Sequence, residues 1–179
     1  MTGVDPMRRV LGFWFETLES KDWFRKSDRL DAEIRDNFEV TYEQVVAGET
    51  AHWRDVPDGR LAEIIVLDQF SRNMFRGTPK MFAADPLALA LAQEAVRSGD
   101  DKRVQEAHCA FIYMPYMHSE TRKVHEEALK LFDGTSNLKW EIQHKAIIDR
   151  FGRYPHRNDI LGRESTPEEI EWLRENSGF

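Results

Sequence analysis

Arginine is concentrated in one short segment of this chain, "RFGRYPHRNDILGREST", which runs from residue 150 to residue 166. The segment holds four arginines and one histidine, although the whole chain carries a formal net charge of −7. Guanidinium groups bind carboxylates and phosphates through two parallel hydrogen bonds. Because cations this close together repel one another, anions must compensate them. Those anions are either carboxylates of the protein, in a salt-bridge network, or the anionic group of a ligand. A third alternative is that the segment is an exposed face that binds another protein.

A related motif lies about half a chain length earlier. The segment "LDQFSRNMFRGTP", residues 67–79, and the arginine-rich segment both contain R-N-x-x-x-G, and both lead into Thr-Pro. The pattern begins at Arg72 in the first segment and at Arg157 in the second. This repeated motif favours a duplicated arrangement of helices, as in helix-pair repeats. Independent use of the same turn residues in two loops would give the same pattern.

The earlier segment also carries an ion pair. Asp68 and Arg72 are four residues apart, so on a helix they lie on one face together with Leu61 and Ile65. Buried charges are tolerated when they are paired and hydrogen-bonded. The segment is therefore either a network that fixes helix packing or one wall of a ligand pocket.

A third polar block, "YMPYMHSE", carries His118 and Glu120. His-x-Glu occurs in zinc deaminases, but these also need Pro-Cys-x-x-Cys, and Cys109 is the only cysteine. His-Glu-x-x-His is absent and the spacing of the histidines indicates no metal site, so we predict neither a metal nor a cofactor. No nucleophile elbow, P-loop or G-x-G-x-x-G is present. Any catalysis would be acid–base chemistry by His118, Glu120 and His156, and whether the protein is an enzyme stays open.

We predict that the three polar blocks converge into one pocket, because the arginines need the carboxylates of the other blocks. The residues predicted to bind the ligand are Asp68, Gln69, Arg72, Asn73, Arg76, Arg153, Arg157, Asn158 and Arg163. The ligand is either a small anionic metabolite or a peptide. In the second case a helical-repeat module would grip an acidic or C-terminal carboxylate group on its concave face.

Composition limits the class of protein. The chain has 179 residues, 41% hydrophobic and 32% charged, which is typical of one soluble globular domain over residues 1–179. The negative charge argues against binding nucleic acid. No apolar run is long enough to span a membrane, and the start lacks a secretory signal, so we predict a cytoplasmic protein. The oligomeric state stays open.

Helix signals run along the whole chain. Asp5-Pro6, Asp85-Pro86 and Thr166-Pro167 each place a capping residue before a proline. The stretch from Asp58 to Phe70 is apolar nearly all round, which predicts a central helix. Pro115 is expected to break a helix. With no hairpin pattern, we predict about eight helices with short loops in an all-α domain.

Three blocks, "LDQFSRNMFRGTPKMFAADPLALALA", "FIYMPYMHSE" and "RFGRYPHRNDILGRESTPEE", resemble in this order the bacterial domain of unknown function 924 family. The similarity spans nearly the whole chain. It implies an all-α fold like tetratricopeptide repeats, a superhelix of antiparallel helix pairs, and it brings no established activity. The polar residues of the family's blocks fall on the site residues named above and on Ser119. His125 stands where glutamine is expected, which argues against His125 as an essential ligand.

Overall fold

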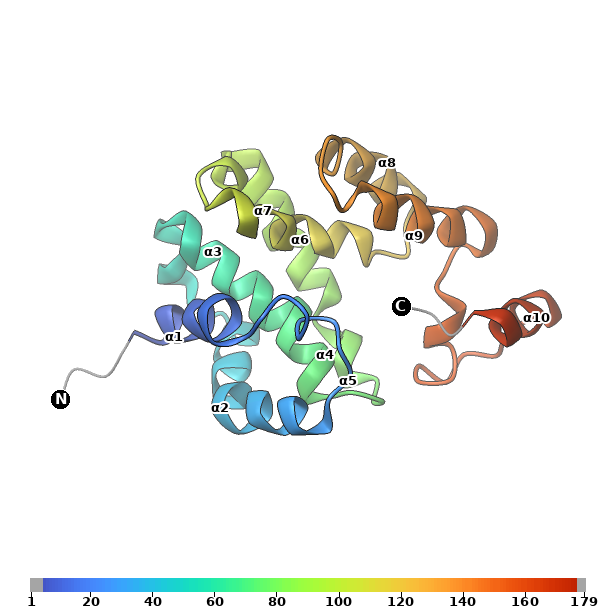
Figure 1. The fold of residues 1–179 in the computed structure, drawn as a ribbon, viewed down its shortest axis with the longest axis horizontal. Coiled ribbons are helices and arrows are strands. Elements are labelled where there is room, and N and C mark those ends of the chain that lie inside the picture. Colours follow the sequence, from blue (N-terminus) through green and yellow to red (C-terminus); the bar gives the residue numbers. More distant parts are fainter. Residues whose placement is uncertain (1–4, 177–179) are drawn as a thin grey trace. The chain divides into compact units, whose positions relative to one another are not determined.

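Figure 1 shows the computed structural model of the chain, which describes residues 5–176. These residues form helices joined by short loops and contain no β-strand, so the predicted all-α class is confirmed. The described chain falls into two compact units. Unit 1 holds the residues up to Arg76 and Lys80–Pro115, and unit 2 holds Gly77–Pro79 and the residues from Tyr116 onward. The single domain and the superhelix stay predictions.

Unit 1 contains most of the helices. In chain order they are α1 (Pro6–Gly12), the π-helix η1 (Phe13–Thr17), α2 (Asp28–Val46), the 3₁₀ helix η2 (Ala51–Asp55), α3 (Pro57–Ile64), the π-helix η3 (Ile65–Phe70), α4 (Ser71–Met74), α5 (Lys80–Ala83), α6 (Asp85–Ser98), the 3₁₀ helix η4 (Asp100–Lys102) and α7 (Glu106–Met117), whose last two residues belong to unit 2. Asp5 caps α1 by accepting the N–H of Met7 at 3.1 Å, as its position before proline predicts.

The predicted central helix runs without a break through α3, η3 and α4. Every residue from 61 to 71 is buried, as expected for a segment that is apolar nearly all round. α2 packs against η3 and α4, and α6 packs against α3. The π-helical stretch of residues 65–70 was not predicted. Such stretches are rare and frequently occur at functional sites.

Unit 2 is a pair of helices followed by a structured loop and a last helix: α8 (Arg122–Leu131), α9 (Leu138–Phe151), the 3₁₀ helix η5 (Pro155–Arg157) and α10 (Pro167–Glu175). α8 and α9 lie side by side, and α10 packs against η5 (Figure 1). The core contains Ile147, Ile148 and Tyr154. Thr166 and Glu169 form the capping box that their spacing predicts at the start of α10.

Pro115 does not break its helix, so that prediction was wrong. α7 continues through Pro115 to Met117. The proline lies in the last turn, where its missing N–H costs a single hydrogen bond, and the helix ends two residues later.

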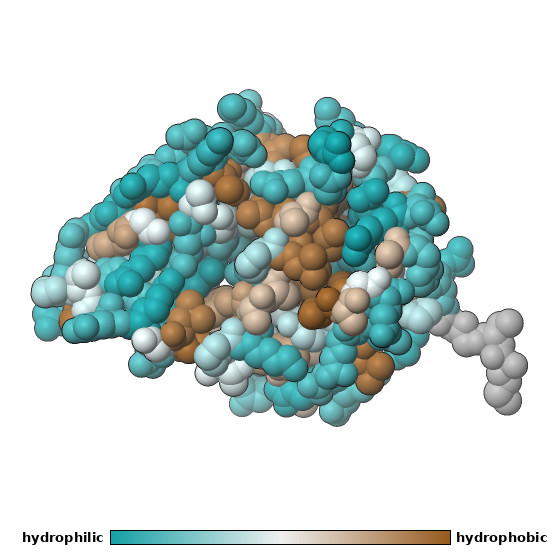
Figure 2. Space-filling model, turned by 180° about the vertical axis from the view of Figure 1, so that it is seen from behind, coloured by the Kyte–Doolittle hydropathy of each residue, from teal (hydrophilic) through white to brown (hydrophobic). Residues whose placement is uncertain are grey.

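The surface is mixed. Figure 2 shows hydrophobic residues among hydrophilic ones on one face of the molecule. The exposed large hydrophobic side chains are Phe24, Val40, Val46, Val56, Trp140, Ile142 and Ile170. Within residues 5–176, no helix combines the length and the apolar character that crossing a membrane requires.

Candidate functional site

The predicted site residues of unit 1 lie on and just after the π-helix η3. Asp68 is fully buried, and Gln69 donates to its Oδ2 at 2.6 Å. Nη1 of Arg72 lies 3.2 Å from Oδ1 of Asp68, so the ion pair predicted from the spacing of four residues is confirmed. This pair ties the end of η3 to α4.

Two further aspartates compensate the arginines of this group. Arg72 donates to both oxygens of Asp85, at 3.0 and 3.1 Å. Nη2 of Arg76 and Nδ2 of Asn73 donate to the same oxygen of Asp31, Oδ1, at 2.9 and 2.8 Å. Neither Asp31 nor Asp85 was predicted as part of the site. Asp31 lies on α2, distant in sequence from the side chains that it binds. Asp85 was predicted to cap a helix, but α6 begins at Asp85 with Ala84 in the cap position, and the carboxylate of Asp85 binds Arg72 instead.

In unit 2, Glu120 is the centre of a hydrogen-bond network. Its two carboxylate oxygens accept from Nη1 and Nη2 of Arg163 at 2.6 and 2.9 Å, and Oε1 also accepts the N–H of Tyr154 at 2.7 Å. Burial alone would raise the pKa of Glu120, but these hydrogen bonds and the charge of Arg157 lower it below its ordinary value. Glu120 is therefore a carboxylate at neutral pH.

A second forked ion pair, in which one guanidinium binds both oxygens of one carboxylate as Arg163 binds Glu120, joins the loop after α9 to α10. Arg153 donates to Oε1 and Oε2 of Glu169 at 2.6 and 2.7 Å. The hydrogen bond from Arg153 is the main reason why the pKa of Glu169 falls to about 2. Asn158 links the two forks, because its Oδ1 accepts from Nε of Arg163 at 2.9 Å and its Nδ2 donates to Glu169 at 3.3 Å.

Arg157 differs from the other two arginines of the loop in being buried, with 6% of its surface exposed. Its guanidinium carbon lies 4.6 Å from the centre of the Tyr154 ring, at the distance of a cation–π contact. Its Nη2 donates to the backbone oxygen of His118 at 3.0 Å. These contacts bring the block that carries His118 and the arginine-rich segment, which were predicted to converge, together inside unit 2.

Imidazole rings surround the same tyrosine. The centre of the His156 ring lies 5.4 Å from that of Tyr154, and the centre of His144 lies 5.8 Å from it. His118 is 6.4 Å from His144 by the same measure. Burial lowers the pKa of His144 to about 3, and burial and the charge of Arg157 lower that of His156 to about 4. Both rings are uncharged at neutral pH.

His125 also contacts Tyr154, with its Nε2 3.3 Å from the tyrosine hydroxyl, but it has a different environment. It is fully buried, with Nδ1 2.7 Å from Oε1 of the buried Glu141 and Nε2 2.8 Å from the backbone oxygen of Ser119. The pair joins α8 to α9, and its buried hydrogen bonds position the segment that carries Ser119. This indicates that His125 has a structural role.

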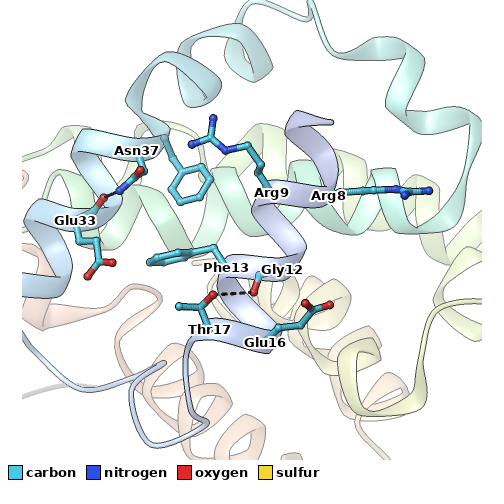
Figure 3. A pocket seen from close by; sticks show the side chains of 9 residues that line it. Arg8, Arg9, Gly12, Phe13, Glu16, Thr17, Glu33 and Asn37 are labelled. Carbon is cyan, nitrogen blue, oxygen red and sulfur yellow. Dashed lines mark hydrogen bonds between the residues drawn. The ribbon is translucent and has the colours of Figure 1, made fainter. Parts of the chain in front are cut away.

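Within residues 5–176, no three His, Cys, Asp or Glu side chains are arranged to hold a metal ion. The structure also contains a pocket in unit 1, between α1, η1 and α2, and none of the predicted site residues lines it (Figure 3). The predicted site residues thus form one group in each unit. A single pocket built from both groups stays a prediction.

Comparison with known proteins identifies relatives without a known activity. The chain matches the family described as bacterial protein of unknown function (DUF924) over residues 10–177. It is 38% identical to a protein of unknown function from Agrobacterium tumefaciens whose structure has been solved. That likeness has a TM-score of 0.90 and covers 95% of this chain and 97% of the other. No curated protein matches the chain.

Proposed function

Since the chain belongs to the bacterial DUF924 family, for which no activity is established, we propose a function from the chemistry of unit 2. We propose that the protein binds a small anionic metabolite there, through Arg157 and the imidazoles of His118 and His156. A carboxylate or phosphate group would be the part that these side chains recognise.

The gathering of N–H donors around the ring of Tyr154 supports this proposal. The guanidinium of Arg157 lies over the ring at 4.6 Å, and His156 lies beside it at 5.4 Å between ring centres. An uncharged imidazole next to a guanidinium avoids repulsion and still offers an N–H to an anion. Ionisable groups whose pKa values are strongly shifted by burial and by one charged neighbour cluster at functional sites.

The forked ion pairs provide the frame of the proposed site. Glu120 holds Arg163, and Glu169 holds Arg153, so both of these arginines already have carboxylate partners. Their role in the proposal is to fix the loop between α9 and α10 that carries His156 and Arg157. If the bound molecule reacts, His118 and His156 suit proton transfer better than Glu120, since both oxygens of Glu120 accept from Arg163.

Thermal unfolding with added phosphate tests the proposal, because an anion that binds the folded state raises its melting temperature. We expect phosphate to stabilise the wild type more than Arg157→Ala, compared with chloride at the same ionic strength. Arg150→Ala is the matched control. It removes an arginine from the same segment whose ion pair with Glu168 is exposed, so the phosphate effect should stay at the wild-type level.

The unfolding free energy of Arg157→Ala without phosphate separates site from scaffold. If Arg157 serves only the fold, its removal should cost about 3–5 kcal/mol and phosphate should have no specific effect. Thr166→Ala provides the scale for a purely structural change: it removes the helix cap of α10 and should cost about 1 kcal/mol while phosphate stabilisation persists. A large loss in Arg157→Ala with no phosphate effect on the wild type would reject the anion site.

Peptide binding is the second candidate, and the exposed Trp140 of α9 favours it. Trp140 is 44% exposed, and aromatic anchors of this kind are common in peptide-binding surfaces. If phosphate does not bind, an immobilised library of short acidic peptides is the next probe. Trp140→Ala should then bind the selected peptide more weakly than the wild type does, whereas Arg150→Ala should bind it equally well.

A further inference from the structure

The pocket of unit 1 lies far along the chain from the arginine-rich loop and has a different chemistry. It has a volume of about 420 Å³ and is bordered by α1 and η1 on one side and by α2 on the other (Figure 3). Pockets that bind small molecules have volumes of roughly 300–1,000 Å³. The space is therefore sufficient for a ligand the size of a short peptide.

Two aromatic rings form the apolar part of this pocket. Phe13 comes from the π-helix η1 and Phe38 from α2, and their ring centres are 5.1 Å apart at an interplanar angle of 60°. Both rings also contact Phe70, at 6.0 and 4.7 Å. Because the rings pack on each other and on the core, they are held in place before any ligand binds. Phe38 is already buried, with 3% of its surface exposed, so a ligand would cover the partly exposed ring of Phe13, and burying its apolar part there is favourable.

Charged side chains of both signs line this pocket. Arg8 and Arg9 line the pocket together with Glu16 and Glu33, so the positive and negative charges are equal in number. None of these four has an ion-pair partner within the described part of the chain. A ligand with a single net charge would gain from one pair and be repelled by the other. A zwitterion gains from both.

The two charges that face the rings come from opposite borders. Arg9 extends from α1 with its guanidinium 5.7 Å from the centre of the Phe38 ring, whereas Glu33 and Asn37 extend from α2 (Figure 3). Asn37 donates through its Nδ2 to the backbone oxygen of Glu33 at 2.8 Å, and its Oδ1 is an acceptor that could bind a donor of the ligand. The cationic end of a ligand would therefore bind near Glu33 on the α2 side, and its anionic end would bind near Arg9 on the α1 side.

We propose that this pocket binds a short apolar peptide with free termini, such as a dipeptide that carries an aromatic side chain. Its C-terminal carboxylate pairs with Arg9, its N-terminal ammonium pairs with Glu33, and its side chain covers the partly exposed ring of Phe13. The opposite charges of such a peptide are separated by an apolar body, as are the charges of the pocket. The site is independent of the anion site proposed for unit 2.

The dipeptide phenylalanylalanine is a suitable probe, followed by titration in backbone amide NMR spectra. We expect saturable shifts that are confined to amides of α1, η1 and α2. The N-acetylated dipeptide lacks the ammonium group and the C-terminal amide lacks the carboxylate. Each should bind about two- to fivefold more weakly, the range expected for one exposed ion pair.

Two variants assign each end of the peptide. Arg9→Gln should bind the free dipeptide more weakly than the wild type does, and it should bind the free dipeptide and its C-terminal amide with equal affinity. Glu33→Gln should bind the free dipeptide and its N-acetylated form with equal affinity. Arg29→Gln and Glu43→Gln remove the same charges from exposed positions of α2 outside the pocket and should bind like the wild type. All four positions are exposed, so the variants should fold, and well-dispersed spectra verify this.

Three results would overturn the proposal. The first is a wild type that shows no saturable shift at the solubility limit of the dipeptide. The second is a set of shifts that lies outside α1, η1 and α2. The third is equal weakening by the pocket variants and their controls, which would mean that the dipeptide responds only to the overall charge of the protein.

Discussion

Glu120 holds both terminal nitrogens of Arg163, at 2.6 and 2.9 Å, although the two side chains are 43 residues apart in sequence. Each side chain is about one quarter exposed, so solvent weakens the pair but does not remove its effect. We predict that Glu120→Gln lowers the unfolding free energy by about 1–3 kcal/mol, as expected for charge-assisted hydrogen bonds. Urea unfolding monitored by circular dichroism measures this.

A double-mutant cycle tells whether the loss comes from this pair. Arg163→Gln should cost a similar amount, and the double variant should be more stable than the sum of the two losses implies. Simple additivity of the two losses would show that Glu120 acts through the N–H of Tyr154 instead.

Gly59 provides a test of packing in unit 1. A Cβ atom at this position would lie 1.9 Å from the backbone oxygen of Trp53, which cannot move without displacing η2. We predict that Gly59→Ala costs about 3 kcal/mol or more, because overpacking against backbone is not relieved by a rotamer change. Gly12→Ala is the matched control. Its Cβ would meet only Glu16 at 3.7 Å, so its unfolding free energy should stay within about 1 kcal/mol of wild type. Equal effects of the two substitutions would contradict the prediction.

Helical periodicity and capping residues predicted most of the helices, but not the π-helical stretches η1 and η3. The capping box at Thr166 and the central helix of α3, η3 and α4 both follow from local sequence. Pro115 was misjudged, because the cost of a proline depends on its distance from the helix end, and the sequence does not give the end of α7.

The partners of the polar residues were harder to predict. Glu120 lies in a block predicted to converge with the arginine-rich loop, and it binds Arg163. Glu169 was not predicted to bind an arginine, and it binds Arg153. Glu169 was recognised only as a capping residue, and it performs both roles at once. Tertiary packing decides which carboxylate a long arginine side chain reaches, and the spacing of the two residues in the sequence does not predict this pairing.

Removal of metal ions should leave the fold unchanged. Among the described residues, His125 and Glu141 are a buried pair of potential ligands, but they bind each other at 2.7 Å. We predict that EDTA does not change the melting temperature, because a structural metal would contribute its binding free energy to stability. A lower melting temperature in EDTA that zinc restores would show that a structural metal is present.

Stability should fall in mild acid because of the histidines around Tyr154. The pKa of His156 is lowered from 6.5 to about 4 by burial and by Arg157, and Glu120 only partly offsets this. The unfolded chain therefore binds a proton that the folded chain does not, so stability is complete above about pH 6.5 and is lost as the pH falls toward 4.

Between about pH 7 and pH 5, this histidine should account for about 2 kcal/mol of lost unfolding free energy. We predict that His156→Gln removes that part of the pH dependence, whereas His52→Gln, at an exposed position of unit 1, leaves it as in the wild type. Urea unfolding at a series of pH values measures both variants. Carboxylates such as Glu169, with a pKa of about 2, contribute only at lower pH and do not obscure the comparison. An unchanged slope in His156→Gln would mean that the pKa of His156 is the same in the folded and the unfolded chain, and the description of His156 as an imidazole kept uncharged by burial and by Arg157 would then be wrong.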